Sequence, residues 1–224
     1  MFRVIARAYI KEGFEKEAIE AAQSEGAIQQ LMERGEIMTV GCFKWERNVF
    51  VYCECIDRQL EPEELLPGMA AFLDDWPGQR AARKWVPMID VFHFNEPASY
   101  DHWLRKDTVE RRVGRVAHLK PEMAASYIYY HYQLQEEQAF HGPKYEIIAM
   151  HENMLFGYQE FPAVVEKPAL PGKLSTAGTP ADWGDSRMDL HFQPWEDGHL
   201  YFKPVEQLFA HYCEFSKKRL KNGG

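Results

Sequence analysis

Runs of alternating apolar and polar residues separate two longer stretches in which apolar side chains recur at helical spacing. The first half of the chain shows this pattern most clearly. Gly35 ends its longer helical stretch, and Pro62 opens the shorter one. The pattern predicts a strand over 2–11, a helix over 14–33, strands over 37–44 and 48–56, a helix over 62–75 and a strand over 86–94. This β-α-β-β-α-β order is that of a ferredoxin-like unit.

Three short segments of the first half recur in the second half in the same order. Val116–Lys120 resembles Arg7–Lys11, His151–Glu160 resembles Trp45–Glu54, and Pro204–His211 resembles Pro87–Phe94, at offsets of 109, 106 and 117 residues. Collinear matches at similar offsets indicate a duplication. We therefore expect a first unit over 1–95, a connector over 96–111 and a second unit over 112–214.

Each such unit covers one sheet face with its own helices and leaves the other face bare. Two units in one chain can bury those faces against each other. The predicted fold is therefore α+β, with two tandem ferredoxin-like β-α-β-β-α-β units packed as an intrachain dimeric α/β barrel around a pocket. Aromatic strand residues such as Tyr158 suit that interior.

The second unit departs from the first after its two central strands. Its strand to Lys120 and a helix from Pro121 to about residue 140 follow the repeat, as do strands over 144–150 and 154–161. Residues 162–182 are instead rich in proline and glycine. A long stretch without predicted structure is often a functional lid, and a solvated surface insertion is the other interpretation.

The helix of the second unit carries the clearest candidate chemistry. Tyr127 and His131 are four residues apart, so they share one helix face. Histidine titrates near neutrality and can take and give a proton, and tyrosine can donate or accept a hydrogen bond. The repeat places Ala18 and Ala22 at these positions in the first unit, which predicts one site per chain. A packed core around the two rings is the alternative.

These residues stand in a wider pattern. Val116–Met123 is followed by Tyr127-x-x-x-His131, then Tyr145-Glu146-Ile147, Asn153–Glu160 and Pro204–Phe209. In this order and spacing, residues 112–212 resemble the L-rhamnose mutarotase family, and the first unit resembles a more diverged copy.

The resemblance implies a fold, an activity and a set of site residues. The fold is a dimeric α/β barrel, and the activity is exchange of sugar anomers without metal or cofactor. The catalytic residues would be His131, Tyr127 and Tyr145. Sugars also stack on aromatic faces, so the predicted substrate-binding residues are Trp183, Tyr158, His118 and Trp195.

Charge and composition limit the partners. The formal net charge is −8, which disfavours binding to nucleic acids and to anionic membranes. We expect the one basic cluster, Lys217–Lys221, to be a solvated part of the surface. No apolar run is long enough to span a membrane, and the N-terminus does not read as a signal peptide. Cys42, Cys53, Cys55 and Cys213 lack the spacing of a zinc site, so we expect reduced thiols, no metal and a cytoplasmic protein.

The sequence thus favours a cofactor-free sugar mutarotase-like isomerase, with a monosaccharide as partner, as a monomeric pseudo-dimer or a homodimer. Two other functions stay open. One is a non-catalytic sugar-binding or small-molecule-binding protein, and the other is a heme-handling or monooxygenase-type protein of the same barrel fold.

Overall fold

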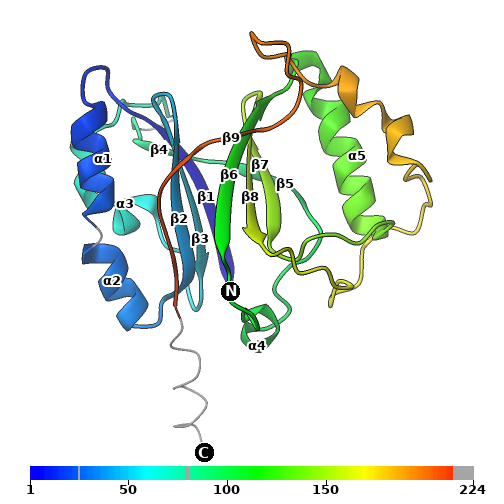
Figure 1. Cartoon of the computed structure of the whole chain (residues 1–224), viewed down its shortest axis with the longest axis horizontal. Coiled ribbons are helices and arrows are strands. Elements are labelled where there is room, and N and C mark those ends of the chain that lie inside the picture. Colours follow the sequence, from blue (N-terminus) through cyan, green and yellow to red (C-terminus); the bar gives the residue numbers. More distant parts are fainter. Residues whose placement is uncertain (25, 79–80, 214–224) are drawn as a thin grey trace, which may run out of the picture. The chain divides into compact units, whose positions relative to one another are not determined.

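The computed structural model describes residues 1–24, 26–78 and 81–213, and within them two five-stranded antiparallel sheets are formed (Figure 1). The predicted mixture of helices and antiparallel sheets is confirmed. The basic cluster Lys217–Lys221 lies outside the described residues. Closure of the sheets into one barrel stays a prediction.

Two compact units divide the chain, and neither is a single continuous segment. Within the described residues, unit 1 consists of Met1–Met88, Ser99–Leu104 and Glu206–Cys213. Unit 2 consists of Ile89–Ala98 and Arg105–Val205.

Unit 1 holds the sheet β10-β2-β3-β1-β4. Its strands are β1 (Phe2–Tyr9), β2 (Ile37–Trp45), β3 (Asn48–Cys55), β4 (Trp85–Pro87) and β10 (Glu206–Tyr212), and its helices are α1 (Glu15–Gln23), α2 (Gly26–Glu33), α3 (Pro62–Leu65), the 3-10 helix η1 (Pro67–Phe72) and α4 (Tyr100–Trp103). The helix expected over 14–33 is therefore two helices, since Ser24 leaves the helical conformation and both serine and glycine are poor helix formers. The helix expected over 62–75 breaks before Pro67.

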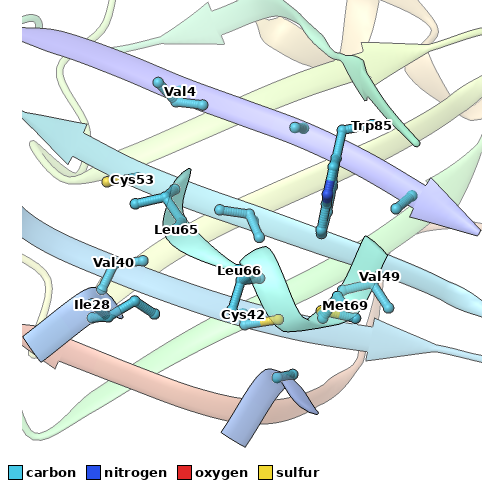
Figure 2. Close-up of a cluster of buried hydrophobic side chains, with 14 of the residues drawn as sticks. Val4, Ile28, Val40, Cys42, Val49, Cys53, Leu65, Leu66, Met69 and Trp85 are labelled. Atoms are coloured by element: carbon cyan, nitrogen blue, oxygen red, sulfur yellow. The ribbon is translucent and has the colours of Figure 1, made fainter. Parts of the chain in front are cut away.

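The core of unit 1 lies between one face of this sheet and the helical segments. Figure 2 shows Val4, Val40 and Cys53 from the strands near Ile28 and Leu65 from the helices, and all five are buried. Cys53 and Cys55 share a face of β3, with sulfur atoms 3.8 Å apart. Alternation along β3 thus delivers every second side chain to one apolar core.

Unit 2 holds the sheet β5-β7-β8-β6-β9. Its elements are β5 (Ile89–His93), β6 (Arg111–His118), β7 (Glu146–His151), β8 (Met154–Phe161), β9 (Lys203–Pro204), α5 (Ala124–Glu137) and the 3-10 helices η2 (Pro121–Met123), η3 (Trp183–Ser186) and η4 (Met188–Leu190). Helix α5 packs on the sheet (Figure 1), and Gln138, in the left-handed conformation, ends it slightly before the expected residue 140. In place of a second helix, the chain forms only η3 and η4.

The strand expected over 86–94 is two strands that join different sheets. Trp85–Pro87 pairs with β1, whereas Ile89–His93 pairs with β7. The closing strand of the second half is divided in the same way at Pro204, since Lys203–Pro204 pairs with β6 and Glu206–Tyr212 pairs with β2. Each pairing ends one residue after the matched prolines, where the amide of Met88 donates to the carbonyl of Ile5 and the amide of Val205 donates to the carbonyl of Gly114. The closing strands of the two halves are therefore divided between the two sheets in the same way.

Among the described residues, no helix combines the length and the apolar character needed to cross a lipid bilayer.

Candidate functional site

Helix α5 brings Tyr127 and His131 together on the face that packs on the sheet. Their rings stack with centroids 3.9 Å apart and an interplanar angle of 28°. Tyr127 is 1% exposed and His131 is 7% exposed. Their separation by one helical turn places both side chains in the core of unit 2.

The hydrogen bond of His131 fixes its tautomer. Its Nδ1 lies 2.9 Å from the carbonyl oxygen of Tyr127. A carbonyl can only accept, so Nδ1 carries the proton and Nε2 carries the lone pair. Among the described residues, Nε2 has no hydrogen-bond partner. The pKa of His131 is lowered to about 4, mainly because burial disfavours the charged ring. The hydrogen bond to the Tyr127 carbonyl acts in the opposite direction, and His191 contributes to the lowering. The ring is therefore neutral near pH 7.

Two more aromatic side chains complete the surroundings of this ring. Phe92 of β5 and Trp183 of η3 each present a T-shaped contact to His131, with centroids at 5.2 Å and 5.4 Å. The side chain of Asp182 accepts the amide of Gly184 and holds Trp183 at the start of η3. We call His131, Tyr127, Phe92 and Trp183 the His131 cluster.

An ion pair that the sequence did not reveal lies on the same side of the sheet. Arg115 of β6 donates to Glu146 of β7 across Gly157 of β8. A Cβ at Gly157 would stand 2.8 Å from Nε of Arg115, so a larger residue there would make the Arg115 side chain shift. Burial raises the pKa of Glu146 although Arg115 opposes the shift, and burial also raises the pKa of Tyr127. Glycine inside a strand pattern was the available signal for this feature.

Tyr145 and Tyr158 belong to a different cluster. The hydroxyl of Tyr158 donates to Glu160 at 2.7 Å, and Arg105 donates to the same carboxylate through two nitrogens at 2.9 Å. The guanidinium of Arg105 also lies 3.9 Å above the ring of Tyr145. A cavity of about 240 Å³ adjoins Arg105, Tyr145 and Glu160. Tyr145 therefore lies in a different cluster from His131 and Tyr127, and the catalytic role that the resemblance implies for it stays a prediction.

The Tyr-x-Glu pair of this cluster also occurs in unit 1. There the hydroxyl of Tyr52 donates to Glu54 at 2.7 Å, and the indole nitrogen of Trp103 donates to Glu54 at 2.8 Å. Both carboxylates are buried. The same Tyr-x-Glu hydrogen bond thus occurs on β3 of unit 1 and on β8 of unit 2.

His118 and Trp195 form a third group at the end of β6. Their ring centroids are 5.1 Å apart. The indole nitrogen of Trp195 donates to the carbonyl of Tyr201, and the ammonium of Lys203 lies 4.9 Å from the Trp195 ring. The seven residues singled out in the sequence thus fall into three groups. The His131 cluster contains three of the seven residues, His131, Tyr127 and Trp183.

The proline- and glycine-rich segment 162–182 is bound along α5. Glu136 accepts from the amide and the ammonium of Lys173, and Glu137 accepts from Thr176, Gly178 and Thr179. These hydrogen bonds, that of Thr176 foremost, lower the pKa of Glu137 to about 2. The segment leads directly into Trp183, so its attachment sets how Trp183 lies against His131.

Metal ligation has no support in the geometry. Within residues 1–24, 26–78 and 81–213, no group of three or more His, Cys, Asp or Glu side chains is arranged to hold a metal ion.

No protein-family model matches the chain, and no curated protein matches it. Three solved structures are similar to it. One from Fusobacterium nucleatum subsp. nucleatum, described as a proposed monooxygenase, has 9% identity over 94% of this chain and 93% of its own, with a TM-score of 0.41. A proposed monooxygenase from Lactobacillus acidophilus has 10% identity over 94% and 95%, with a TM-score of 0.39.

The third structure is described as a heme-binding protein from Thermus thermophilus. It has 10% identity over 100% of this chain and 96% of its own, with a TM-score of 0.30. None of the three is described as a rhamnose mutarotase, so the specific resemblance to that family is unsupported. With TM-scores below 0.5, these similarities assign no activity to this chain.

Proposed function

We propose that unit 2 carries a small-molecule site in which neutral His131 accepts a proton from a planar, largely apolar substrate. One observation carries this proposal: Nε2 of His131 has no partner among the described residues, while Nδ1 is fixed by the Tyr127 carbonyl. A ring held in this way presents one lone pair in one direction, as a general base requires.

The pKa of His131 limits which substrates suit it. With a pKa of about 4, the ring is available as a base at neutral pH, but it is a weak base. Proton transfer therefore needs an acidic group whose anion is delocalised and stays beside the imidazolium that forms. A phenol or an enolisable carbonyl conjugated to a ring has this property.

The surroundings of His131 favour such a ring over a sugar. Its contacts are the rings of Tyr127, Phe92 and Trp183, which present apolar faces and edges. A monosaccharide carries hydroxyls around its ring and loses free energy when they are buried without partners. The carboxylate of Glu137, also on α5, is already bonded to segment 162–182. Sugar mutarotation therefore has less support than chemistry on a conjugated ring.

The opening to Nε2 is narrow, because His131 is 7% exposed. Trp183 stands at the end of segment 162–182 and contacts the His131 ring edge-on. In the proposed function, displacement of Trp183 admits the substrate ring to the place beside His131. This gives segment 162–182 the role of a lid. An iron porphyrin does not fit the cluster as it stands, because Phe92 and Trp183 already contact the imidazole.

The test uses 4-nitrophenol, a planar acidic ring whose anion absorbs at longer wavelength than its neutral form. At a pH where the free phenol is mostly protonated, bound 4-nitrophenol should absorb at longer wavelength, because its O–H donates to Nε2 of His131. His131→Phe should abolish the shift, and His141→Phe, which changes an exposed histidine, should retain it. An unchanged spectrum, or a shift retained in His131→Phe, overturns the proposal.

Three further assays separate the proposal from the other functions. Anomer exchange measured by NMR saturation transfer, lost in His131→Phe, would replace it with the sugar mutarotase function. A Soret band on hemin titration, lost in His118→Ala or His131→Ala, would replace it with heme handling. Oxygen consumption with conjugated phenols, lost in His131→Phe, would extend it to the monooxygenase activity named for two similar structures.

A further inference from the structure

A serine and a histidine that the proposed function does not use meet at the start of α5. Oγ of Ser126, the third residue of α5, lies 2.9 Å from Nε2 of His191, which follows η4. Figure 1 shows the segment over 183–191 (orange) beside this helix. His191 is 2% exposed, and Ser126 is half-buried. The two residues are 65 positions apart in the chain, so only packing within unit 2 brings them together.

The second hydrogen bond of His191 decides which atom of the pair donates. Its Nδ1 lies 3.0 Å from the carbonyl oxygen of Arg187, and a carbonyl can only accept, so Nδ1 carries the proton. Nε2 therefore carries the lone pair, and the hydroxyl of Ser126 donates to it. A serine hydroxyl that donates to an imidazole, with the other ring nitrogen held by an acceptor, is the arrangement that activates a nucleophile.

The charges around the pair favour a reaction that develops negative charge. Ser126 lies in the first turn of α5, where the helix dipole is positive. The ammonium of Lys120 donates to the carbonyl of Leu190 at 3.0 Å, so it is held at the residue that precedes His191. An acyl oxygen that becomes negative at Ser126 is therefore stabilised by the helix dipole, and Lys120 supplies a cation on the neighbouring segment.

The same side of α5 offers aromatic surface beside the serine. Tyr129 and Tyr130 follow Ser126 by three and four residues, so the three side chains share one side of the helix. The ring of Tyr130 makes T-shaped contacts to His191 and to Tyr129, with centroids at 6.1 Å and 5.6 Å. Tyr129 is 59% exposed. An aromatic group of a substrate can therefore contact the Tyr129 ring while the reacting carbon lies at Ser126.

We propose that Ser126 and His191 are a nucleophile and a base that hydrolyse small carboxylic esters of phenols. Oγ of Ser126 bonds to the carbonyl carbon of the ester, and its proton passes to Nε2 of His191. The bond from that carbon to the phenolic oxygen breaks, and the imidazolium returns the proton to the leaving oxygen. Water then attacks the acyl-serine in the same way, so ester and water yield acid and phenol. This activity is independent of the function proposed for His131.

Acetylation of the full-length protein by 4-nitrophenyl acetate tests the nucleophile. We expect a burst of 4-nitrophenolate equal to the amount of protein, and an acetyl group on Ser126, located by peptide mass spectrometry after an acid quench. Ser126→Ala should remove both, and Ser24→Ala, which changes an exposed serine of unit 1, should retain both. A wild-type protein that carries no acetyl group at Ser126 overturns the proposal, and this measurement needs no variant.

The variant His191→Gln separates a base from a purely structural hydrogen bond. The glutamine oxygen can still accept from Ser126, but the side chain cannot take up a proton. Acetylation of Ser126 should slow by about a hundredfold or more, as loss of a general base predicts. An unchanged rate would mean that the bond only ties η4 to α5, and the proposal would be wrong. Because the assay reads Ser126 itself, its outcome is separate from that of the 4-nitrophenol test on His131.

Two acetyl donors test the aromatic surface. 4-Nitrophenyl acetate and acetic anhydride transfer the same acetyl group, but only the ester carries a ring. Tyr129→Ala should lower the ratio of the ester rate to the anhydride rate at Ser126 about two- to tenfold, as loss of one aromatic contact allows. An unchanged ratio would overturn the assignment of phenol esters as the substrate class.

Discussion

Acidification provides a direct test of the burial of His131. The pKa of this ring falls from an unfolded value of about 6.5 to about 4 in the folded protein, mainly because burial disfavours the charged form. The unfolded chain therefore binds a proton between these values while the folded protein does not. Stability contributed by the neutral ring is fully present above about pH 6.5 and is lost as the pH falls through about 4.

The size of this effect follows from the same two values. Each unit of pH below 6.5 costs about 1.4 kcal/mol until the folded ring itself is protonated, so the loss at about pH 5 is about 2 kcal/mol. His131→Phe retains an aromatic ring among Phe92 and Trp183 but cannot be protonated. Between about pH 7 and about pH 5, the wild-type protein should lose about 2 kcal/mol more stability than this variant.

Urea unfolding at a series of pH values, followed by circular dichroism, measures this difference. His141→Phe provides the matched control, because it removes an exposed histidine and should leave the wild-type pH dependence in place. Parallel stability curves for the wild-type protein and His131→Phe would refute the burial argument. They would also remove the premise that a neutral base stands in this cluster.

Three other predictions test the remaining parts of the structure. Glu137→Ala should remove the acceptor that binds segment 162–182, and limited proteolysis should then cut this segment faster than in the wild-type protein; an unchanged cleavage rate would contradict its anchoring role. Gly157→Ala should cost about 1–3 kcal/mol in urea unfolding, because its methyl group would press on the arginine beside it, whereas Gly26→Ala, with open space around it, should cost nothing. Glu160→Gln should cost about 3–5 kcal/mol because it removes a buried carboxylate that pairs with arginine, and Glu20→Gln, which breaks an exposed pair, should cost under about 1 kcal/mol; similar losses for the two would refute the argument.

Most element positions were predictable because each one depends on local patterning. β1 at Phe2–Tyr9 and β3 at Asn48–Cys55 lie where alternation predicted strands, and α5 lies where helical spacing predicted a helix. The joint location of Tyr127 and His131 also follows from the four-residue spacing alone. Repeat matching correctly related Pro87 to Pro204, although it did not reveal that the strands after them change sheets.

The positions of the tyrosines show what the sequence pattern alone does not predict about the site. Tyr145 entered the set through a family resemblance, and the structure places its ring beneath Arg105 instead of beside His131. Tyr145 lies in the turn that precedes β7, although a strand was expected from residue 144, so strand alternation does not fix the direction of its side chain. Arg115 was overlooked because its ion pair joins strands that are distant in sequence.

The sequence by itself located strands β1 and β3, helix α5 and the one helix face that carries Tyr127 and His131. These properties depend on residues a few positions apart, so the periodicity of apolar residues along the chain predicts them. Only the tertiary structure decided which sheet each closing strand joins, which nitrogen of His131 keeps its lone pair, and that Ser126 donates to His191 in unit 2. Those properties depend on long-range pairing and on loss of water, and both arise only when distant segments pack together.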